Sequence, residues 1–485
     1  MKSVKKNIIF NLMMVLCKII FPIISFPYAA RVLGVENIGK VNYCISVINY
    51  FVLFAGLGVN VYATREGVRY RDDKDELSKF AKEVFSINFV STIVAYILLF
   101  GLIISNVFYK HTELMLVCSL NIVFSTFGIE WVYQIVEDYK YISLRTIVIQ
   151  FISFICLITC VKKREDYIIY AIITVFAAGG NCFANIWQSR KIINWKKRFS
   201  LDIKKHFKPI LIIFGVSAST SIYLSLDMVM VGVIRDDYEV GLYSAAVKLN
   251  SVVKTLITSI SSVLLSRLSY YKALNKNEDY IGLLKRGVNT ILILVIPASF
   301  GIIYLSREIM IIFCGKEFDS AVFACIILSV NMVFSVVDGM IYNQICLPNK
   351  LEKQASKATF VGAAGNFVMN LFFVYKWGYE GAAITTLLSE VMVFCILLKV
   401  ANKVVDMKEV FKSVHQYILS GGLMMLILFF LGNIVHCGTV MRVIMGMIVG
   451  GVSYFGALIV VMHNDYVNEL IIQVKDRIKS VMRMS

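Results

Sequence analysis

Runs of about 20 apolar residues recur along the whole chain, and short polar stretches rich in lysine and arginine separate them. A helix of about 20 apolar residues spans the hydrocarbon core of a bilayer. The pattern predicts fourteen transmembrane helices, at residues 8–30, 38–62, 83–106, 113–136, 143–160, 167–189, 209–234, 239–266, 287–305, 319–345, 356–375, 380–398, 416–435 and 440–462. Pro22 and Pro27 predict a kink in the first of them, because proline lacks the N–H of a helical turn. We expect an all-α polytopic membrane protein.

Composition and charge support this class and exclude others. Of the 485 residues, 58% are hydrophobic and 17% are charged, and the mean hydropathy is +0.74. The 49 lysines and arginines outnumber the 32 acids, which would suggest nucleic acid if the charge covered a soluble face. Here the basic clusters occupy alternate loops, a pattern typical of membrane orientation and of contact with anionic lipid. We expect no nucleic-acid partner, and both termini in the cytoplasm.

The chain contains an internal repeat. Asn121-Ile-Val-Phe-Ser125, which continues to Gln134, matches Asn331-Met-Val-Phe-Ser335, which continues to Gln344, and Val35-Glu-Asn-Ile-Gly39 matches Asp237-Tyr-Glu-Val-Gly241. The spacing covers six predicted helices, an even number, so both halves enter the membrane in the same direction. We predict a six-helix lobe at residues 1–200, a parallel six-helix repeat at 201–402, and two further helices with a cytoplasmic tail at 403–485.

Three lysines fall inside predicted helices, where a charge costs about 2.5–3.5 kcal/mol on insertion scales. Lys18 lies deep in the first helix, and Lys248 and Lys254 lie in the eighth. Charged residues at such depths usually face a wet cavity or a partner. We expect these lysines to hold an anionic group. For Lys248 the alternative is an ion pair with Asp227, across the short turn between the seventh and eighth helices.

Four acids also lie inside predicted helices: Glu130, Asp227, Asp338 and Glu390. Glu130 and Asp338 occupy nearly equivalent places in the two repeats. Such acids could bind a coupling ion, Na⁺ or H⁺, and alternatively they could fix helix ends against arginines of the inner loops.

The remaining residues suggest no enzyme chemistry. The eleven cysteines show no metal-ligand spacing, and no loop between the predicted helices is long enough for a catalytic module. We therefore expect no catalytic residues, no bound cofactor and no metal site. We expect a transport role instead.

Several motifs together resemble one family of membrane proteins. They are Phe26-Pro-Tyr-Ala-Ala-Arg-Val-Leu-Gly34, Thr64-Arg-Glu66, Glu130-Trp131 with Gln134 and Glu137, Asp227-Met-Val-Met-Val-Gly232, Val240-Gly-Leu-Tyr-Ser-Ala-Ala-Val-Lys248, Asn343-Gln344, Gly381-Ala-Ala383 and Ser389-Glu390. The set is similar to the polysaccharide transporter family, the Wzx-type O-antigen and capsule repeat-unit flippases of the MATE-like oligosaccharide-transporter superfamily.

The resemblance implies a two-lobed bundle in the bacterial cytoplasmic membrane. It would move an undecaprenyl-pyrophosphate-linked oligosaccharide from the inner to the outer leaflet by alternating access, among membrane lipids and with other polysaccharide-assembly proteins as partners. Lys18, Lys248 and Lys254 are then the candidates for pyrophosphate or acidic-sugar contact, with Arg31 and Arg65 as secondary candidates. A drug or cation antiporter of the same fold and a peptidoglycan-precursor flippase are the alternatives.

Overall fold

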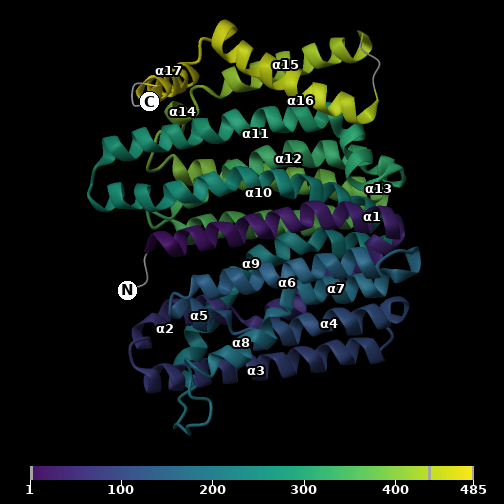
Figure 1. The fold of residues 1–485 in the computed structure, drawn as a ribbon, viewed down its shortest axis with the longest axis vertical. Coiled ribbons are helices and arrows are strands. Elements are labelled where there is room, and N and C mark those ends of the chain that lie inside the picture. Colours follow the sequence, from purple (N-terminus) through teal and green to yellow (C-terminus); the bar gives the residue numbers. More distant parts are fainter. Residues whose placement is uncertain (1–3, 435–437, 483–485) are drawn as a thin grey trace. The chain divides into compact units, whose positions relative to one another are not determined.

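The structure, a computed structural model, describes the backbone of residues 4–434 and 438–482, and those residues form helices without strands (Figure 1). The helices are α1 (Val4–Gly56), α2 (Val59–Gly67), α3 (Lys74–Ile104), α4 (Thr112–Phe127), α5 (Glu130–Ile135), α6 (Tyr139–Cys160), α7 (Tyr167–Gly179), α8 (Asn181–Ser189), α9 (Lys204–Ile234), α10 (Asp237–Ala273), α11 (Asn277–Cys314), α12 (Val322–Met340), α13 (Glu352–Ala401), α14 (Met407–Val410), α15 (Val414–Ile434), α16 (Thr439–Gly456) and α17 (Asp465–Met482), with short 3₁₀ or π turns among them.

Ten helical segments of the described part are long and apolar enough to cross a membrane. Two of them, which include α1 and α13, run to about 50 residues each and cover two predicted spans apiece. The all-α polytopic membrane class is therefore confirmed. The count of fourteen spans and the cytoplasmic placement of the termini stay predictions.

Glycines interrupt the two longest helices. Fifty-three residues in one straight helix would extend about 80 Å, far beyond the ~30 Å of a bilayer core. In α1 the backbone leaves helical geometry at Gly34 (φ 76°, ψ 175°), and in α13 it does so at Gly378 (φ 58°, ψ −138°). Both glycines lie in predicted loops. Glycine allows these breaks because it adopts positive φ without a steric penalty. The break in α1 falls at Gly34, and not at Pro22 or Pro27, which lie within the helix.

The chain divides into two compact units, Met1–Ser244 and Ala245–Ser485, which we call unit 1 and unit 2. In unit 1, α1 packs against α3, α4, α6 and α9, and in unit 2, α11 packs against α12, α15 and α16 while α12 packs against α13. The predicted lobes at 1–200 and 201–402 describe the repeat, and that division stays a prediction.

A chain of buried polar groups fastens the start of α9 to the rest of unit 1. The Glu83 carboxylate on α3 accepts the backbone N–H of Asp202 at 2.9 Å and lies 2.8 Å from His206 Nε2. The other ring nitrogen of His206 lies 2.6 Å from the Tyr62 hydroxyl on α2. Lys205 adds an ion pair to Glu83 at 3.0 Å. These contacts satisfy a carboxylate that is only 1% exposed, which an apolar interior requires.

The repeated glycines Gly39 and Gly241 make a very close helix crossing within unit 1. A Cβ on Gly39 would lie 1.7 Å from the Asp237 carbonyl oxygen, and one on Gly241 would lie 2.1 Å from the Val35 carbonyl oxygen. Beside this crossing the Asn42 amide donates to the Ser244 hydroxyl at 3.0 Å. Only residues without a side chain allow backbones to approach this closely, as at many helix contacts in membranes.

We predict that Gly39→Ala lowers the free energy of unfolding by about 1–3 kcal/mol, because the added methyl must push two backbones apart. Thermal unfolding of the purified protein in detergent would measure this loss. Gly101→Ala on α3 is the control, since nothing lies within 4 Å of the added atom. Equal midpoints for both variants would contradict the close crossing.

Candidate functional site

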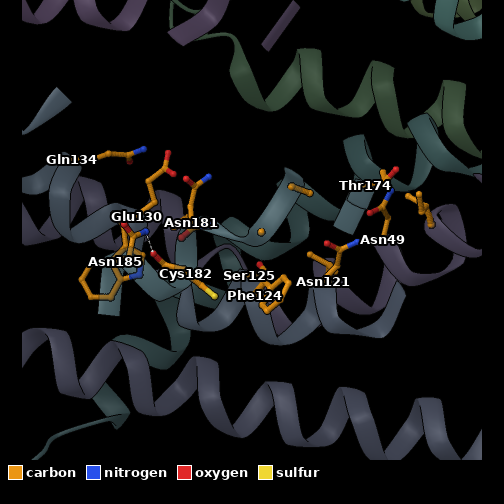
Figure 2. A pocket seen from close by; sticks show the side chains of 17 residues that line it. Asn49, Asn121, Phe124, Ser125, Glu130, Gln134, Thr174, Asn181, Cys182 and Asn185 are labelled. Atoms are coloured by element: carbon orange, nitrogen blue, oxygen red, sulfur yellow. Dashed lines mark hydrogen bonds between the residues drawn. The ribbon is translucent and has the colours of Figure 1, made fainter. Parts of the chain in front are cut away.

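Unit 1 holds a polar cavity of about 430 Å³. Its walls come from α1, α2, α4, α5, α7 and α8. Six carboxamides dominate the polar lining, so we call it the amide cavity; its polar residues are Asn49, Asn60, Asn121, Ser125, Glu130, Gln134, Thr174, Asn181 and Asn185, and Trp131 also contributes to the wall. Figure 2 shows Asn49, Asn121 and Thr174 toward one end and Glu130, Gln134, Asn181 and Asn185 toward the other. This volume falls in the range of small-molecule sites.

Two helix interruptions build one end of the amide cavity. The predicted span 113–136 is divided into α4 and α5, with Ile129 in a left-handed conformation (φ 35°) between them. The predicted span 167–189 is divided into α7 and α8 by a turn at Gly180, whose backbone angles stay near helical values (φ −58°, ψ −17°), so only the break at Ile129 leaves helical geometry. Non-helical backbone inside a membrane bundle is tolerated where it is buried or lines a polar cavity. The interruptions bring Glu130, at the start of α5, into the same wall as Asn181 and Asn185 of α8.

The Arg145 guanidinium on α6 is buried behind this wall. It pairs with the Glu130 carboxylate at 2.6 Å and donates to the Asn185 side-chain oxygen. Its central carbon lies 5.9 Å from the ring centre of Tyr133 and 5.4 Å from that of Tyr141, within the range of cation–π attraction. The Asn185 amide in turn donates to the Gly128 carbonyl. One cation thus ties α5, α6 and α8 together.

The first copy of the repeated motif lies in the cavity wall. Asn121, Ser125 and Gln134 all line it, and the Thr64 hydroxyl lies 2.8 Å from the side-chain oxygen of Gln134. The counterparts of Asn121 and Ser125 in unit 2 are Asn331 and Ser335.

In the second copy, one residue of the motif contacts a cation. Ser335 accepts a hydrogen bond from the Lys254 ammonium, and the side-chain oxygen of Asn331 is buried without a hydrogen-bond partner among the described residues. Lys254 follows Val52 by the same number of residues as Asp237 follows Val35, so the two positions correspond in the repeat. Val52 lines the amide cavity. Equivalent positions therefore form polar sites in both units, and in unit 2 the site carries charge.

Two acids accompany Lys254 in unit 2. The Asp338 side chain on α12 is 6% exposed, and neither of its carboxylate oxygens has a hydrogen-bond partner in the described part of the chain. Glu390 on α13 and Lys254 are close enough to act electrostatically on this carboxylate. The structure thus brings together three of the sequence-predicted residues. A buried, unpaired carboxylate is costly, and in a transporter it is a candidate for ion binding.

The other predicted residues lie apart from these two groups. Asp227 accepts a hydrogen bond from the Tyr243 hydroxyl at 2.9 Å within unit 1, and Lys248 is half-buried on α10. Arg31 on α1 and Arg65 on α2 are exposed. Lys18 lies outside the residues whose side chains the structure describes. The roles of these residues in pyrophosphate binding stay predictions, as does the Asp227–Lys248 pair.

Sequence reasoning missed Arg145 and most of the amides. Arg145 lies near the start of a predicted span, where a basic residue is usually an interfacial anchor. Asn181 and Asn185 are four residues apart and therefore share a helix face, which is the signal that could have identified them.

We predict that Arg145→Leu lowers the free energy of unfolding by about 1.5–3 kcal/mol, because it removes the charged hydrogen bonds to the Glu130 carboxylate and the Asn185 side-chain oxygen. The double variant Arg145→Leu with Glu130→Gln should recover part of that loss. Chemical unfolding in detergent would measure both. Arg307→Leu is the control: it removes the exposed pair with Asp319 and should change stability little. A loss no larger than in the control would contradict the role of Arg145.

Comparisons with known proteins agree with this architecture. A candidate O-antigen transporter of Escherichia coli K12 is 25% identical over 406 residues, which cover 82% of this chain and 96% of the relative. One from Shigella dysenteriae is 23% identical over 81% of this chain and 99% of its own. A candidate low-salt glycan biosynthesis flippase of Haloferax volcanii is 24% identical over 48% of this chain and 49% of its own.

Two solved structures share the fold. The lipid II flippase MurJ superposes with a TM-score of 0.74 at 18% identity, over 93% of this chain and 98% of that one. A multidrug resistance MATE family transporter superposes with a TM-score of 0.56 at 14% identity, over 84% and 97%. The family described as polysaccharide biosynthesis protein matches residues 4–272, more than half of the chain. This chain therefore belongs to the polysaccharide biosynthesis protein family.

Proposed function

We propose that this protein is a flippase for lipid-linked oligosaccharides. It translocates undecaprenyl-pyrophosphate-linked repeat units from the cytoplasmic to the outer leaflet of the bacterial cytoplasmic membrane by alternating access, for assembly of O-antigen, capsule or exopolysaccharide. It is a transporter and not an enzyme. The names of the relatives and the family membership support this proposal.

The observation that carries the proposal is the amide cavity. Each carboxamide offers both a donor and an acceptor, which matches the alternating donor and acceptor character of sugar hydroxyls. A multidrug cation antiporter would instead favour a cavity dominated by carboxylates. The single carboxylate in the described lining, that of Glu130, is already paired with Arg145. The amide cavity therefore favours a carbohydrate over an organic cation.

The charged group in unit 2 supports a coupling role. Asp338 and Glu390 bind the coupling ion, Na⁺ or H⁺. The bound ion changes the electrostatic potential at the Lys254 ammonium. Lys254 also remains available to the pyrophosphate, together with Lys18 and Lys248.

Translocation is tested in proteoliposomes with a fluorescent undecaprenyl-pyrophosphate oligosaccharide. The native chain should move it between leaflets, and Asn121→Leu should slow this about fivefold, the effect of losing a hydrogen bond of about 1 kcal/mol. Asn433→Leu, at an exposed position of α15, is the matched control and should keep the native rate. Uptake of organic cations without movement of the lipid would transfer the assignment to a drug antiporter. Movement of lipid II alone would transfer it to a peptidoglycan-precursor flippase.

Coupling is tested with imposed Na⁺ and pH gradients in the same vesicles. One of the gradients should accelerate the native protein, and Asp338→Asn should abolish that acceleration while it leaves the undriven rate in place, because the amide cannot bind the ion as a charge. Asp465→Asn, at an exposed site, should respond as the native chain does. A full gradient response in Asp338→Asn would remove this acid from the coupling site.

A further inference from the structure

The amide cavity has almost no net charge. Among its described lining residues, Glu130 alone carries a formal charge, and the Arg145 guanidinium 2.6 Å away balances it. The two partners differ in exposure: the Glu130 side chain is 35% exposed, and that of Arg145 is 4% exposed. The pair therefore presents its carboxylate toward the cavity and keeps its cation behind the wall.

One amide of the cavity, that of Asn181, favours a ligand that donates a hydrogen bond. The side-chain oxygen of Asn181 is buried and has no partner within the described part of the chain. A buried acceptor without a donor destabilises a structure, and a ligand O–H or N–H would relieve this. The Asn185 side chain is already engaged at both ends, by Arg145 and by the Gly128 carbonyl. The unmet demand at this end of the cavity is for donors.

A sugar carboxylate would fit this site poorly. It is an acceptor without a proton to give, so it could not satisfy the Asn181 oxygen. It would also bring an unpaired negative charge into a cavity whose one described carboxylate is already neutralised by Arg145, and a charge removed from water without a counter-ion is costly. The described wall offers no lysine or arginine to pair with that charge. Hydroxyl and N-acylamino groups carry hydrogen-bond donors and no charge, so they can satisfy the Asn181 oxygen without bringing an unpaired charge into the cavity.

On these grounds, and resting on the proposed function, we infer that the amide cavity holds an uncharged sugar residue of the transported oligosaccharide and discriminates against sugars that carry a carboxylate. The selectivity resides in unit 1 and is separate from recognition of the pyrophosphate. It sets the chemical class of repeat unit that the protein accepts at this position.

The test compares two lipid-linked substrates that differ in one group. Fluorescent undecaprenyl-pyrophosphate disaccharides end in glucose or in glucuronic acid, so a hydroxymethyl group is exchanged for a carboxylate. In proteoliposomes the native chain should move the glucose form about tenfold faster, because only the glucuronate form brings an unpaired negative charge into the cavity. Equal rates, or faster movement of the glucuronate form, would overturn the inference.

A charge added to the wall should reverse the preference. Asn49 on α1 is exposed and lines the cavity, so a lysine fits there without repacking the core. Asn49→Lys should raise the glucuronate-to-glucose rate ratio about tenfold, because the ammonium pairs with the sugar carboxylate, and Asn433→Lys, at an exposed position outside the cavity, should leave it at the native value. If Asn49→Lys kept the native ratio, the cavity would not discriminate between charged and uncharged sugars.

A binding assay separates this inference from the proposed function. In a full-length variant with Trp187, Trp195 and Trp377 replaced by phenylalanine, the remaining Trp131 lies in the cavity wall and reports on occupancy. Methyl glucoside should quench its fluorescence saturably, and methyl glucuronoside should not at the same concentrations. Failure of translocation with this binding preference intact would reject the flippase and keep the selectivity. Equal binding of both glycosides, or binding of neither, would reject the selectivity itself.

Discussion

A guanidinium buried inside a membrane-embedded bundle must find a partner for its charge, and the two terminal nitrogens of the Arg145 side chain find partners in two short helices. Glu130 comes from the six-residue α5, and Asn185 from the nine-residue α8. Helices this short are unstable alone, so their positions depend on tertiary contacts. Because the same contacts place Glu130 and Asn185 in the cavity wall, the amide cavity owes its shape to this one cation.

The two halves of the duplication differ in how their buried charged groups are paired. The position 210 residues after Arg145 is Ala355, so the second half has no equivalent guanidinium. Its cation is Lys254, bound to Ser335, and Asp338 is left without a hydrogen-bond partner among the described residues. A shared plan of repeated Asn and Ser positions therefore supports one site in which charge is neutralised and another in which charge remains. Under the proposed function, divergence of this kind would let one bundle recognise an uncharged group and a charged one.

Hydropathy predicted the helical class well because the bilayer dictates the length and composition of a spanning helix. Helix interruptions were harder, since a break such as the one at Ile129 depends on what the backbone packs against and not on local propensity. The repeat pointed to Asn121, Ser125 and Gln134, but isolated charges indicate function more strongly because they are the most costly residues in a membrane. Neutral amides carry no such signal, and only their arrangement in three dimensions shows that they line one cavity.

The crossing of Gly39 and Gly241 bears on how the duplicated chain arose. Gly39 meets the residue that corresponds to Val35 in the second copy, and Gly241 meets Val35 itself, while Asn42 is bonded to Ser244, its own counterpart. This exchange of equivalent contacts is the mark of an isologous interface, in which one surface pairs with a copy of itself about a two-fold axis. A polypeptide of half this length would already have possessed both sides of the contact. Fusion of two such copies would join both sides of this contact in a single chain, and each copy would then be free to change without altering the other.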